Sequence, residues 1–246
     1  MKLLTTIVFA TLLLMSCNNS EPEEMRSKNR KEKIVQTTLQ ADLDAKKAKW
    51  AAKATDEKKK LYDDGIEAIV KDRILPNAKN VGDTASNFKL TNAIGDTVQL
   101  SDYLKKGKVI LTWYRGGWCP YCNLTLRSLQ QSLPDFKAKG ANLLALTPEV
   151  PDKSISTAEK NNLEFEVLSD IGNEVARDYG VVFTLIPELA ESYQAAFDLH
   201  SYNGDESNEL PLAATYIINK EGIIEYAFLH KDYRNRAEPS EILENL

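Results

Sequence analysis

One stretch near the middle of the chain constrains its fold more than any other. Residues 108–114 (KVILTWY) form an unbroken β-rich apolar run, which is typical of a strand buried on both faces. The chain then turns through a Gly-Gly pair, and residues 123–138 carry leucines at helical spacing. Two of the three cysteines, Cys119 and Cys122, lie between the turn and this helix. A buried strand therefore delivers a Cys-x-x-Cys pair to the start of a helix.

The start of a helix is a favourable place for a reactive thiol. Unpaired backbone N–H groups and the positive end of the helix dipole stabilise a thiolate there. Cys-x-x-Cys spacing at such a site lowers the thiol pKa from about 8.5 to between roughly 3.5 and 7.5. Pro120 suits the first helical turn because it lacks an N–H group. The pattern therefore predicts thiol–disulfide chemistry at Cys119 and Cys122.

Two other uses of the cysteine pair remain open. Zinc takes four ligands, commonly from two such pairs, and here only His200 and His230 could complete the set. A structural disulfide would close a ring of only four residues, which restricts the unfolded chain little. We therefore expect redox chemistry that uses no metal and no cofactor.

The patterns around this stretch indicate an α/β domain. Further strands are expected at 141–146, near 167–168 and in hairpins spanning 88–100 and 215–228, with helices at 153–162, 173–179, 187–197 and 238–246. Such an order describes a mixed central sheet flanked by helices. We expect an exposed loop after the 187–197 helix, with His200 in solvent.

The N-terminus has the composition of a secretory leader. Lys2 precedes an apolar run (residues 3–15) that is too short for a membrane span of roughly 20 residues. The letters LMSC, which end at Cys17, resemble the bacterial lipobox. We expect a lipoprotein signal peptide at residues 1–16 and a lipid anchor on Cys17, the alternative being an ordinary secretory signal. The prediction places the protein in a bacterial cell envelope, facing the periplasm or on the outer-membrane surface.

Residues 17–80 differ in composition from the rest of the chain. They are rich in Lys, Glu, Asp and Ala, which favour helices. We predict a tether followed by a charged, solvated helical arm that spaces the globular domain, residues 81–246, from its anchor. The face expected to meet a partner helix is a row of alanines at 41, 45, 48 and 52. A formal net charge of −5 gives no indication of nucleic-acid binding.

The globular part resembles the peroxiredoxins of the alkyl hydroperoxide reductase / thiol-specific antioxidant family, within the thioredoxin-like superfamily. The resemblance is carried by VGDTASNFKL, WYRGGWCPYC, FEVLSDIGNEVARDYGV and TYIINKEGIIEYAF. It implies a thioredoxin-like fold from Val81 onward and a thiol-dependent reduction of hydrogen peroxide or organic hydroperoxides. It also implies a sulfenic acid, a disulfide between Cys119 and Cys122, a thioredoxin-like or other dithiol reductant, and possible homodimers.

The resemblance assigns roles to the residues of the motif in two ways. Aligned with peroxiredoxins, Cys122 is the sulfur that attacks the peroxide and Cys119 resolves it, which is the assignment we expect. Aligned with thioredoxins, the two roles are reversed. Arg115 is a candidate to lower the thiolate pKa or stabilise the peroxide, the alternative being a solvated arginine at the end of the strand. The residues expected to contact substrate or reductant are Trp118, Pro120 and Tyr121, and the alternative for Trp118 is packing over the turn.

Some positions depart from the family pattern. Thr125 stands where a carboxylate is common, and Ala213 stands where thioredoxins carry a cis-proline. The loop around Ala213 also has no counterpart for the second arginine that assists the attacking cysteine. Two alternatives to a peroxidase therefore remain. One is a thiol–disulfide oxidoreductase of the cell envelope that acts on protein disulfides, and the other is a binding module without catalysis.

Overall fold

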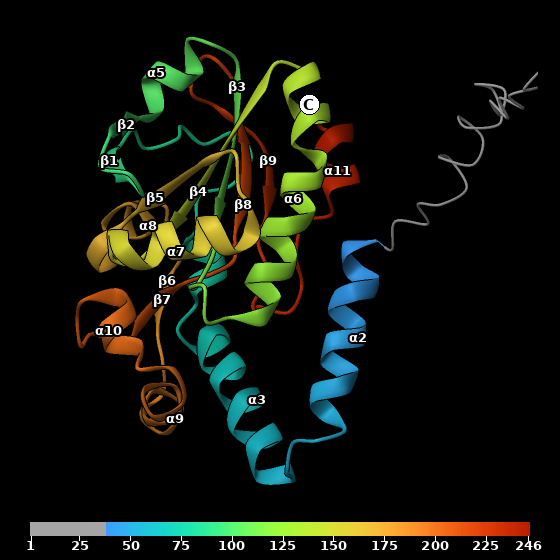
Figure 1. Cartoon of the computed structure of the whole chain (residues 1–246), viewed down its shortest axis with the longest axis vertical. Coiled ribbons are helices and arrows are strands. Elements are labelled where there is room, and N and C mark those ends of the chain that lie inside the picture. Colours follow the sequence, from blue (N-terminus) through green and yellow to red (C-terminus); the bar gives the residue numbers. More distant parts are fainter. Residues whose placement is uncertain (1–37) are drawn as a thin grey trace, which may run out of the picture. The chain divides into compact units, whose positions relative to one another are not determined.

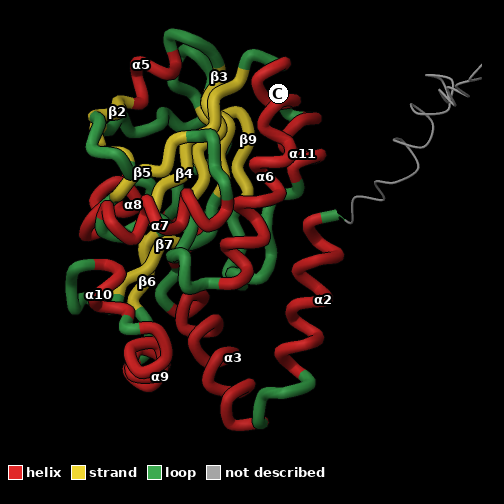
Figure 2. Tube along the Cα trace, in the orientation of Figure 1, coloured by secondary structure: helices red, strands yellow, loops and turns green. Residues whose placement is uncertain are grey.

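The computed structural model describes residues 38–246, which form an α/β unit around a mixed sheet of seven strands (Figures 1 and 2). The strand order is β2-β1-β5-β4-β3-β8-β9. Their bounds are β1 Lys89–Asn92, β2 Thr97–Gln99, β3 Lys108–Trp113, β4 Ala141–Thr147, β5 Glu166–Ser169, β8 Thr215–Ile218 and β9 Ile224–Phe228. Strands β3, β4 and β5 run parallel, and the strands on either side of them pair antiparallel. The predicted mixed sheet is confirmed.

Alternating residues of the central strands separate two apolar cores, one on each face of the sheet. Ile110, Leu143 and Ile217 point to the face covered by α6 (Pro120–Ala138) and α11 (Pro239–Glu244). Leu111 and Leu144 lie in the other core, with residues of α8 (Glu174–Asp178) and α9 (Pro187–Phe197). Two more helices, α5 (Leu100–Leu104) and α7 (Pro151–Asn161), complete the layers. Because β3 lies at the centre of the sheet, its apolar residues are buried on both sides, as predicted.

The predicted insertion contains more structure than its sequence suggests. Helix α9 has the predicted bounds, but the expected exposed loop after it forms α10 (Leu199–Asn203) and β7 (Glu209–Pro211). Strand β7 pairs with β6 (Val182–Thr184) in a separate two-stranded sheet. The expectation of a free loop was wrong because antiparallel pairing with a distant strand satisfies the backbone of this segment.

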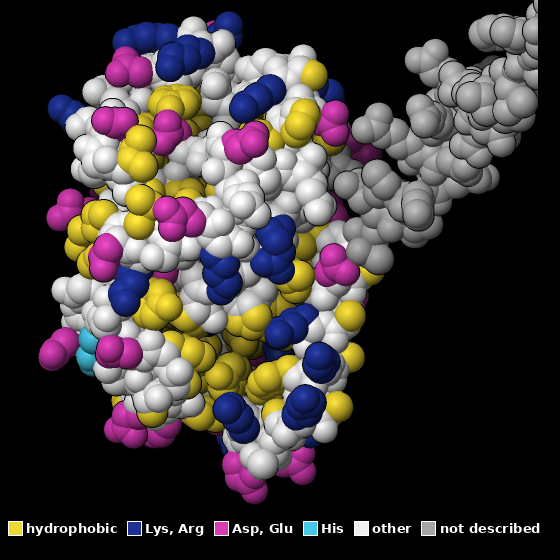
Figure 3. All heavy atoms as spheres, viewed as in Figure 1, with side chains coloured by type: hydrophobic (Ala, Val, Ile, Leu, Met, Phe, Trp, Pro, Cys, Tyr) yellow, Lys and Arg dark blue, Asp and Glu magenta, His cyan; other side chains and the backbone are white. Residues whose placement is uncertain are grey.

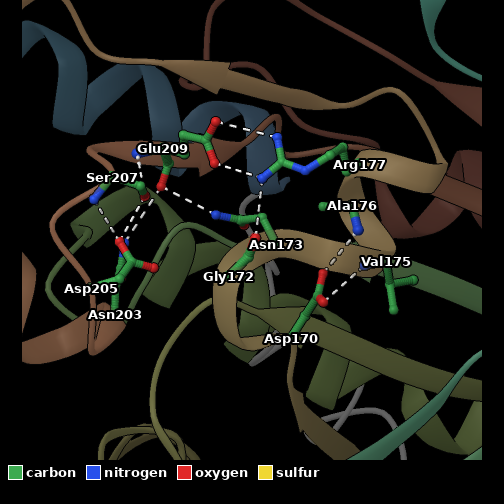
Figure 4. A network of polar contacts seen from close by, with 10 residues as sticks. All are labelled: Asp170, Gly172, Asn173, Val175, Ala176, Arg177, Asn203, Asp205, Ser207 and Glu209. Atoms are coloured by element: carbon green, nitrogen blue, oxygen red, sulfur yellow. Dashed lines mark hydrogen bonds and ion pairs between the residues drawn. The ribbon is translucent and has the colours of Figure 1, made fainter.

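A polar network ties this insertion to the sheet (Figure 4). The two carboxylate oxygens of Asp170 accept the backbone N–H groups of Val175 and Ala176, each at 2.9 Å, and so fix the start of α8. Arg177 on that helix pairs with Glu209 of β7 at 2.7 Å. Asp170, which belongs to the stretch FEVLSDIGNEVARDYGV, therefore has a structural role, because it anchors the helix that holds the insertion.

The N-terminal helices pack against the domain and are not a solvated spacer. They are α2 (Leu39–Ala51), α3 (Asp56–Lys71) and the short α4 (Ile74–Asn77). Leu39 and Leu43 of α2 are buried in the same apolar cluster as the two cysteines, and α3 contacts α9. The alanine row lies on the other side of α2 and is largely exposed. The predicted helices of the N-terminal arm are therefore present. They pack on the domain through Leu39 and Leu43 instead of forming a solvated spacer, and the alanine row is not the packing face.

No helix in the range 38–246 is both long enough and apolar enough to cross a membrane. The predicted signal peptide and the lipid anchor at Cys17 lie outside the described residues.

Candidate active site

The chain leaves β3 through a tight turn that leads directly into α6. Cys119 is the N-cap residue of α6, Pro120 is its first residue, and Cys122 lies in its first turn. Gly116 has φ +149°, and a Cβ atom there would overlap the Trp118 ring. A Cβ atom at Gly117 would overlap the Thr157 hydroxyl. The two glycines are therefore needed because the backbone passes so close to these side chains.

Buried polar side chains hold the turn in place. Glu149 accepts the Gly117 N–H at 2.8 Å and the Tyr114 hydroxyl at 2.9 Å, and it is fully buried. Burial raises the pKa of Glu149, against the opposing effect of these donors. The Asn123 amide donates to the carbonyls of Gly117 and Cys119, at 2.8 and 2.9 Å. Together these contacts fix both ends of the turn that carries Cys119.

Both cysteines are free thiols and only 1% exposed. The backbone N–H of Arg115 points at the Cys122 sulfur from 3.4 Å, and the Arg236 guanidinium Nη2 lies 3.5 Å from the same atom. Arg236 comes from the segment between β9 and α11, so the far C-terminal part of the chain completes the site. The loop before β8 holds no second arginine, as expected from the sequence, and Arg236 reaches the thiols from a different segment that sequence reasoning did not consider.

The charge environment separates the two thiols. Burial alone would raise the pKa of Cys119, but hydrogen bonding from Cys122 and the charges of Arg115 and Arg236 outweigh it and lower that pKa to about 5. Burial raises the pKa of Cys122, and the hydrogen bond to Cys119 and its negative charge raise it further. The lower pKa of the pair therefore belongs to Cys119, while the two hydrogen bonds from Arg115 and Arg236 both reach the Cys122 sulfur, so the pair shares one negative charge in a positively charged site.

The two arginines are buried, and no carboxylate of the described residues pairs with them. Arg115 is 2% exposed and Arg236 is 5% exposed, and no Asp or Glu of residues 38–246 forms an ion pair with either. The Arg115 guanidinium lies 3.9 Å from the centre of the Tyr233 ring and donates to the Tyr193 hydroxyl at 2.9 Å. Aromatic faces attract a cation but do not neutralise it. The positive charge is thus available to an anion at the cysteines.

A cavity of about 220 Å³ opens beside Cys119. Cys119 and Arg115 lie in its wall, whereas Cys122 does not. The other lining residues are mostly aromatic: Trp50, Lys58, Tyr62, Trp118, Pro120, Tyr121, Tyr193, Ala196, Phe197 and Tyr233. Trp118 stacks on Phe197 with ring centres 4.8 Å apart. Cys119 is therefore the sulfur that a small molecule in the cavity would meet.

The structure places the predicted contact residues around this cavity. Trp118, Pro120 and Tyr121 line it together with Arg115 and Cys119. His200 is elsewhere, where its ring Nε2 lies 3.0 Å from Asn208. Within residues 38–246 there is no cluster of three or more His, Cys, Asp or Glu side chains suited to a metal ion.

The departures from the family pattern take structural positions near the site. The Thr125 hydroxyl donates to the Tyr121 carbonyl one turn earlier, at 2.9 Å, and Ala213 is buried just before β8. The buried carboxylate that holds the turn is Glu149, which comes from the segment after β4 rather than from α6.

Sequence reasoning missed several residues of the site. Trp50 and Tyr62 come from the N-terminal helices, Tyr193 from the insertion, and Tyr233 and Arg236 from the segment before α11. One sequence feature could have drawn attention to the last two. The stretch DYRNR (residues 232–236) gathers an aromatic ring and two arginines in a short connection where no strand or helix is expected.

Comparisons of the sequence with known proteins find a family and two kinds of curated relative. A family model described as AhpC/TSA family matches residues 81–227. Peroxiredoxin Bcp of Escherichia coli is 30% identical over 105 residues, covering 43% of this chain and 67% of that protein. Thiol-disulfide oxidoreductase ResA of Bacillus cereus is 31% identical over 103 residues, covering 42% and 58%. The chain spans about three fifths of the length of the curated relatives it matches.

Solved structures confirm the thioredoxin-like fold. The crystal structure of peroxidoxin BcpB from Mycobacterium tuberculosis superposes with a TM-score of 0.54 at 19% identity, and the match covers 68% of this chain and 95% of that one.

Proposed function

The chain belongs to the AhpC/TSA family, and we propose that it is a thiol peroxidase that reduces hydrogen peroxide or organic hydroperoxides through Cys119 and Cys122. The names of its relatives include both peroxiredoxins and thiol–disulfide oxidoreductases. The relatives therefore leave two reactions open, peroxide reduction and thiol–disulfide exchange, and the geometry of the site favours peroxide reduction.

The observation that carries the proposal is the size and wall of the cavity at Cys119. A space of about 220 Å³ admits a peroxide but not a folded protein. Trp50 and Tyr62 of the N-terminal helices form part of its wall, and their rings are 5.2 Å apart. A protein disulfide would meet these helices before it met the sulfur.

We assign the first attack to Cys119. The sequence analysis expected Cys122 to attack first, from the alignment with peroxiredoxins, and nothing in the structure tests that expectation directly. The alternative is better supported, because Cys119 faces the cavity and has the lower pKa. The thiolate is the nucleophilic form of cysteine, and at neutral pH it is held on Cys119 by two arginines and the Cys122 thiol.

In the first step the Cys119 thiolate attacks one peroxide oxygen. A sulfur–oxygen bond forms as the oxygen–oxygen bond breaks, which gives a sulfenic acid. The leaving oxygen takes the proton of the Cys122 thiol and departs as water or an alcohol. Arg115 and Arg236 stabilise the negative charge while it moves, because both are buried and neither forms an ion pair with a carboxylate of residues 38–246.

Loss of charge at Cys119 prepares the second step. The Cys119 thiolate is one of the causes that raise the pKa of Cys122, and a sulfenic acid is neutral. The two arginines then favour the Cys122 thiolate. It attacks the Cys119 sulfur, a disulfide forms, and hydroxide leaves. An external dithiol returns two electrons and two protons, is itself oxidised to a disulfide, and one proton neutralises the hydroxide.

One observation supports the thiol–disulfide oxidoreductase as a second candidate. A low-pKa cysteine at the helix N-cap, with a protonated cysteine one turn behind it, is also the arrangement that such enzymes use. In that reaction Cys119 would attack a substrate disulfide and Cys122 would release the mixed disulfide.

The cellular setting follows from the sequence prediction. We propose a lipid anchor at Cys17 and a place in the bacterial cell envelope, with a thioredoxin-like or other dithiol donor on the same side of the membrane. The family resemblance also suggests that the protein forms a homodimer.

Stopped-flow mixing of the reduced protein with hydrogen peroxide tests the proposed function. Loss of two thiols per peroxide at a rate well above that of free cysteine supports a peroxidase. Slow peroxide reaction combined with rapid reduction of insulin disulfides would support the second candidate, and neither reaction would leave a binding module.

A further inference from the structure

A second cavity, of about 430 Å³, adjoins the one at Cys119. The two share three lining residues, Trp50, Lys58 and Pro120, so they open on either side of the same side chains. The second cavity lies along the end of α2 and the start of α3. Its remaining lining residues are Lys46, Lys49, Lys53, Ala54 and Thr55.

The charge of this second cavity is strongly one-sided. Four lysines line it, and within the described part of the chain no aspartate or glutamate lines either cavity. None of the four lysines forms an ion pair with a described residue, whereas Lys59 and Lys60 just beyond are paired with Asp56 and Asp64. The whole chain carries a formal charge of −5, so the positive charge here is a local feature.

Apolar surface lies directly beside these lysines. Figure 3 shows dark-blue side chains along α2 and α3 with yellow apolar surface in the space between the two helices. The Trp50 and Tyr62 rings, in contact at 5.2 Å, lead from the lysines to the cavity at Cys119. A ligand that satisfied both halves would carry an anionic group at one end and an apolar body that reaches Cys119.

We propose that the lysine-lined cavity is a subsite for the carboxylate of an anionic, amphipathic hydroperoxide, such as a fatty-acid hydroperoxide, and that it selects this substrate class. The carboxylate lies among Lys46, Lys49, Lys53 and Lys58. The apolar chain passes Trp50 and Tyr62, and the hydroperoxide group meets the Cys119 sulfur. The inference rests on the proposed peroxidase reaction and adds no chemical step to it. The subsite is built from α2 and α3, which lie outside the residues matched by the family.

The binding part of the proposal is tested without any peroxide. Decanoate and 1-decanol have the same chain length and differ in charge, and calorimetric titration into the full-length reduced protein compares them. We expect decanoate to bind about tenfold more tightly than decanol at low salt, and the difference to shrink as salt screens the lysines.

Charge reversal locates the subsite. In the double variant Lys49→Glu/Lys53→Glu we expect decanoate binding to weaken at least about tenfold, because about four units of charge change beside the anion. The control is Lys89→Glu/Lys220→Glu, which makes the same net change at exposed lysines that line neither cavity. Circular dichroism verifies that both variants keep the fold.

Each outcome decides the proposal. Equal binding of decanoate and decanol to the wild-type protein overturns it, and so does decanoate binding that is the same in both double variants. Loss of binding to phosphatidylglycerol vesicles in Lys49→Glu/Lys53→Glu, with decanoate binding intact, overturns it in favour of a membrane-facing surface. Failure of hydrogen peroxide to oxidise the wild-type thiols would instead count against the proposed function, and the decanoate result would still decide whether an anion subsite exists.

Discussion

The guanidinium of Arg236 lies 3.5 Å from the sulfur of Cys122, although 114 residues separate the two in the sequence. Arg115 contributes a second buried guanidinium on the same pair of thiols. Burial of a thiolate is costly unless charge or hydrogen bonds compensate it, and these two arginines supply that compensation. The reactivity of the thiols therefore depends on Arg236, which lies in the segment between β9 and α11 and outside the cysteine motif.

Replacement of Arg236 by methionine removes one of these charges while keeping much of the side-chain volume. We expect the pKa of Cys119 to rise by about one unit, worth about 1.4 kcal/mol, and the peroxide reaction at pH values near the folded pKa to slow several-fold, up to roughly tenfold. The pH dependence of thiol alkylation measures the shift. Arg177→Met, on an exposed ion pair with Glu209, is the control and is expected to leave the profile unchanged. The same profile in both variants would show that Arg236 does not act on the thiols.

The lowered pKa of Cys119 predicts a specific pH profile for the wild-type protein. Only the thiolate reacts with iodoacetamide, so the rate is expected to be flat above about pH 6 and to fall as the pH drops through about 5. A thiol with an ordinary pKa would lose reactivity already below about 8.5. Mass spectrometry of the modified protein identifies which cysteine reacts, and a midpoint at the ordinary thiol value would contradict the charge environment described for Cys119.

The helix α2 is expected to protect the thiols. Leu43 is 1% exposed and packs in the cluster that contains both cysteines, so Leu43→Ala is expected to cost about 2–5 kcal/mol in the free energy of unfolding. Native-state alkylation of Cys119 should also become faster, because α2 then detaches more often. Ala45→Ser, on the exposed side of the same helix, is the matched control. Urea unfolding and alkylation kinetics measure both effects, and equal results for the two variants would mean that α2 is not part of the site.

The amide of Asn123 is expected to maintain the turn that carries Cys119. Asn123→Ala leaves the buried carbonyls of Gly117 and Cys119 without this donor, which is expected to destabilise the fold by about 1–3 kcal/mol. The Cys119 alkylation rate should fall as well, because the sulfur loses its fixed position. Asn245→Ala removes an exposed contact with the Glu241 carbonyl and serves as the control. Denaturant unfolding with no difference between the two variants would contradict this role.

Local periodicity made much of the fold predictable. The continuous apolar run predicted β3, and the helical spacing of the leucines predicted α6. Helix α9 was predicted with its observed bounds. The hairpins at 88–100 and 215–228 were predicted from turn residues between alternating apolar runs, and both are present. In these segments the local preference and the tertiary packing agree.

Features that depend on distant partners could not be predicted in the same way. Leu39 and Leu43 are two of the few large apolar residues in a charged segment, and nothing local shows that they meet α6 and the cysteines rather than solvent. The small β6–β7 sheet joins segments that are separated by two helices. Within the site, the cysteines and Arg115 follow from the motif, but Tyr193, Tyr233 and Arg236 are brought there only by the folded chain.

The most direct test of the account compares Cys119→Ser with Cys122→Ser after a single addition of hydrogen peroxide, with a dimedone-type probe to trap sulfenic acid. We predict that Cys122→Ser is labelled at Cys119, because the attacking sulfur remains and its resolving partner is gone. We predict that Cys119→Ser is not labelled at a comparable rate. Rapid labelling of Cys122 in Cys119→Ser, with no labelling of Cys122→Ser, would contradict the claim that Cys119 is the ionised sulfur that meets the peroxide.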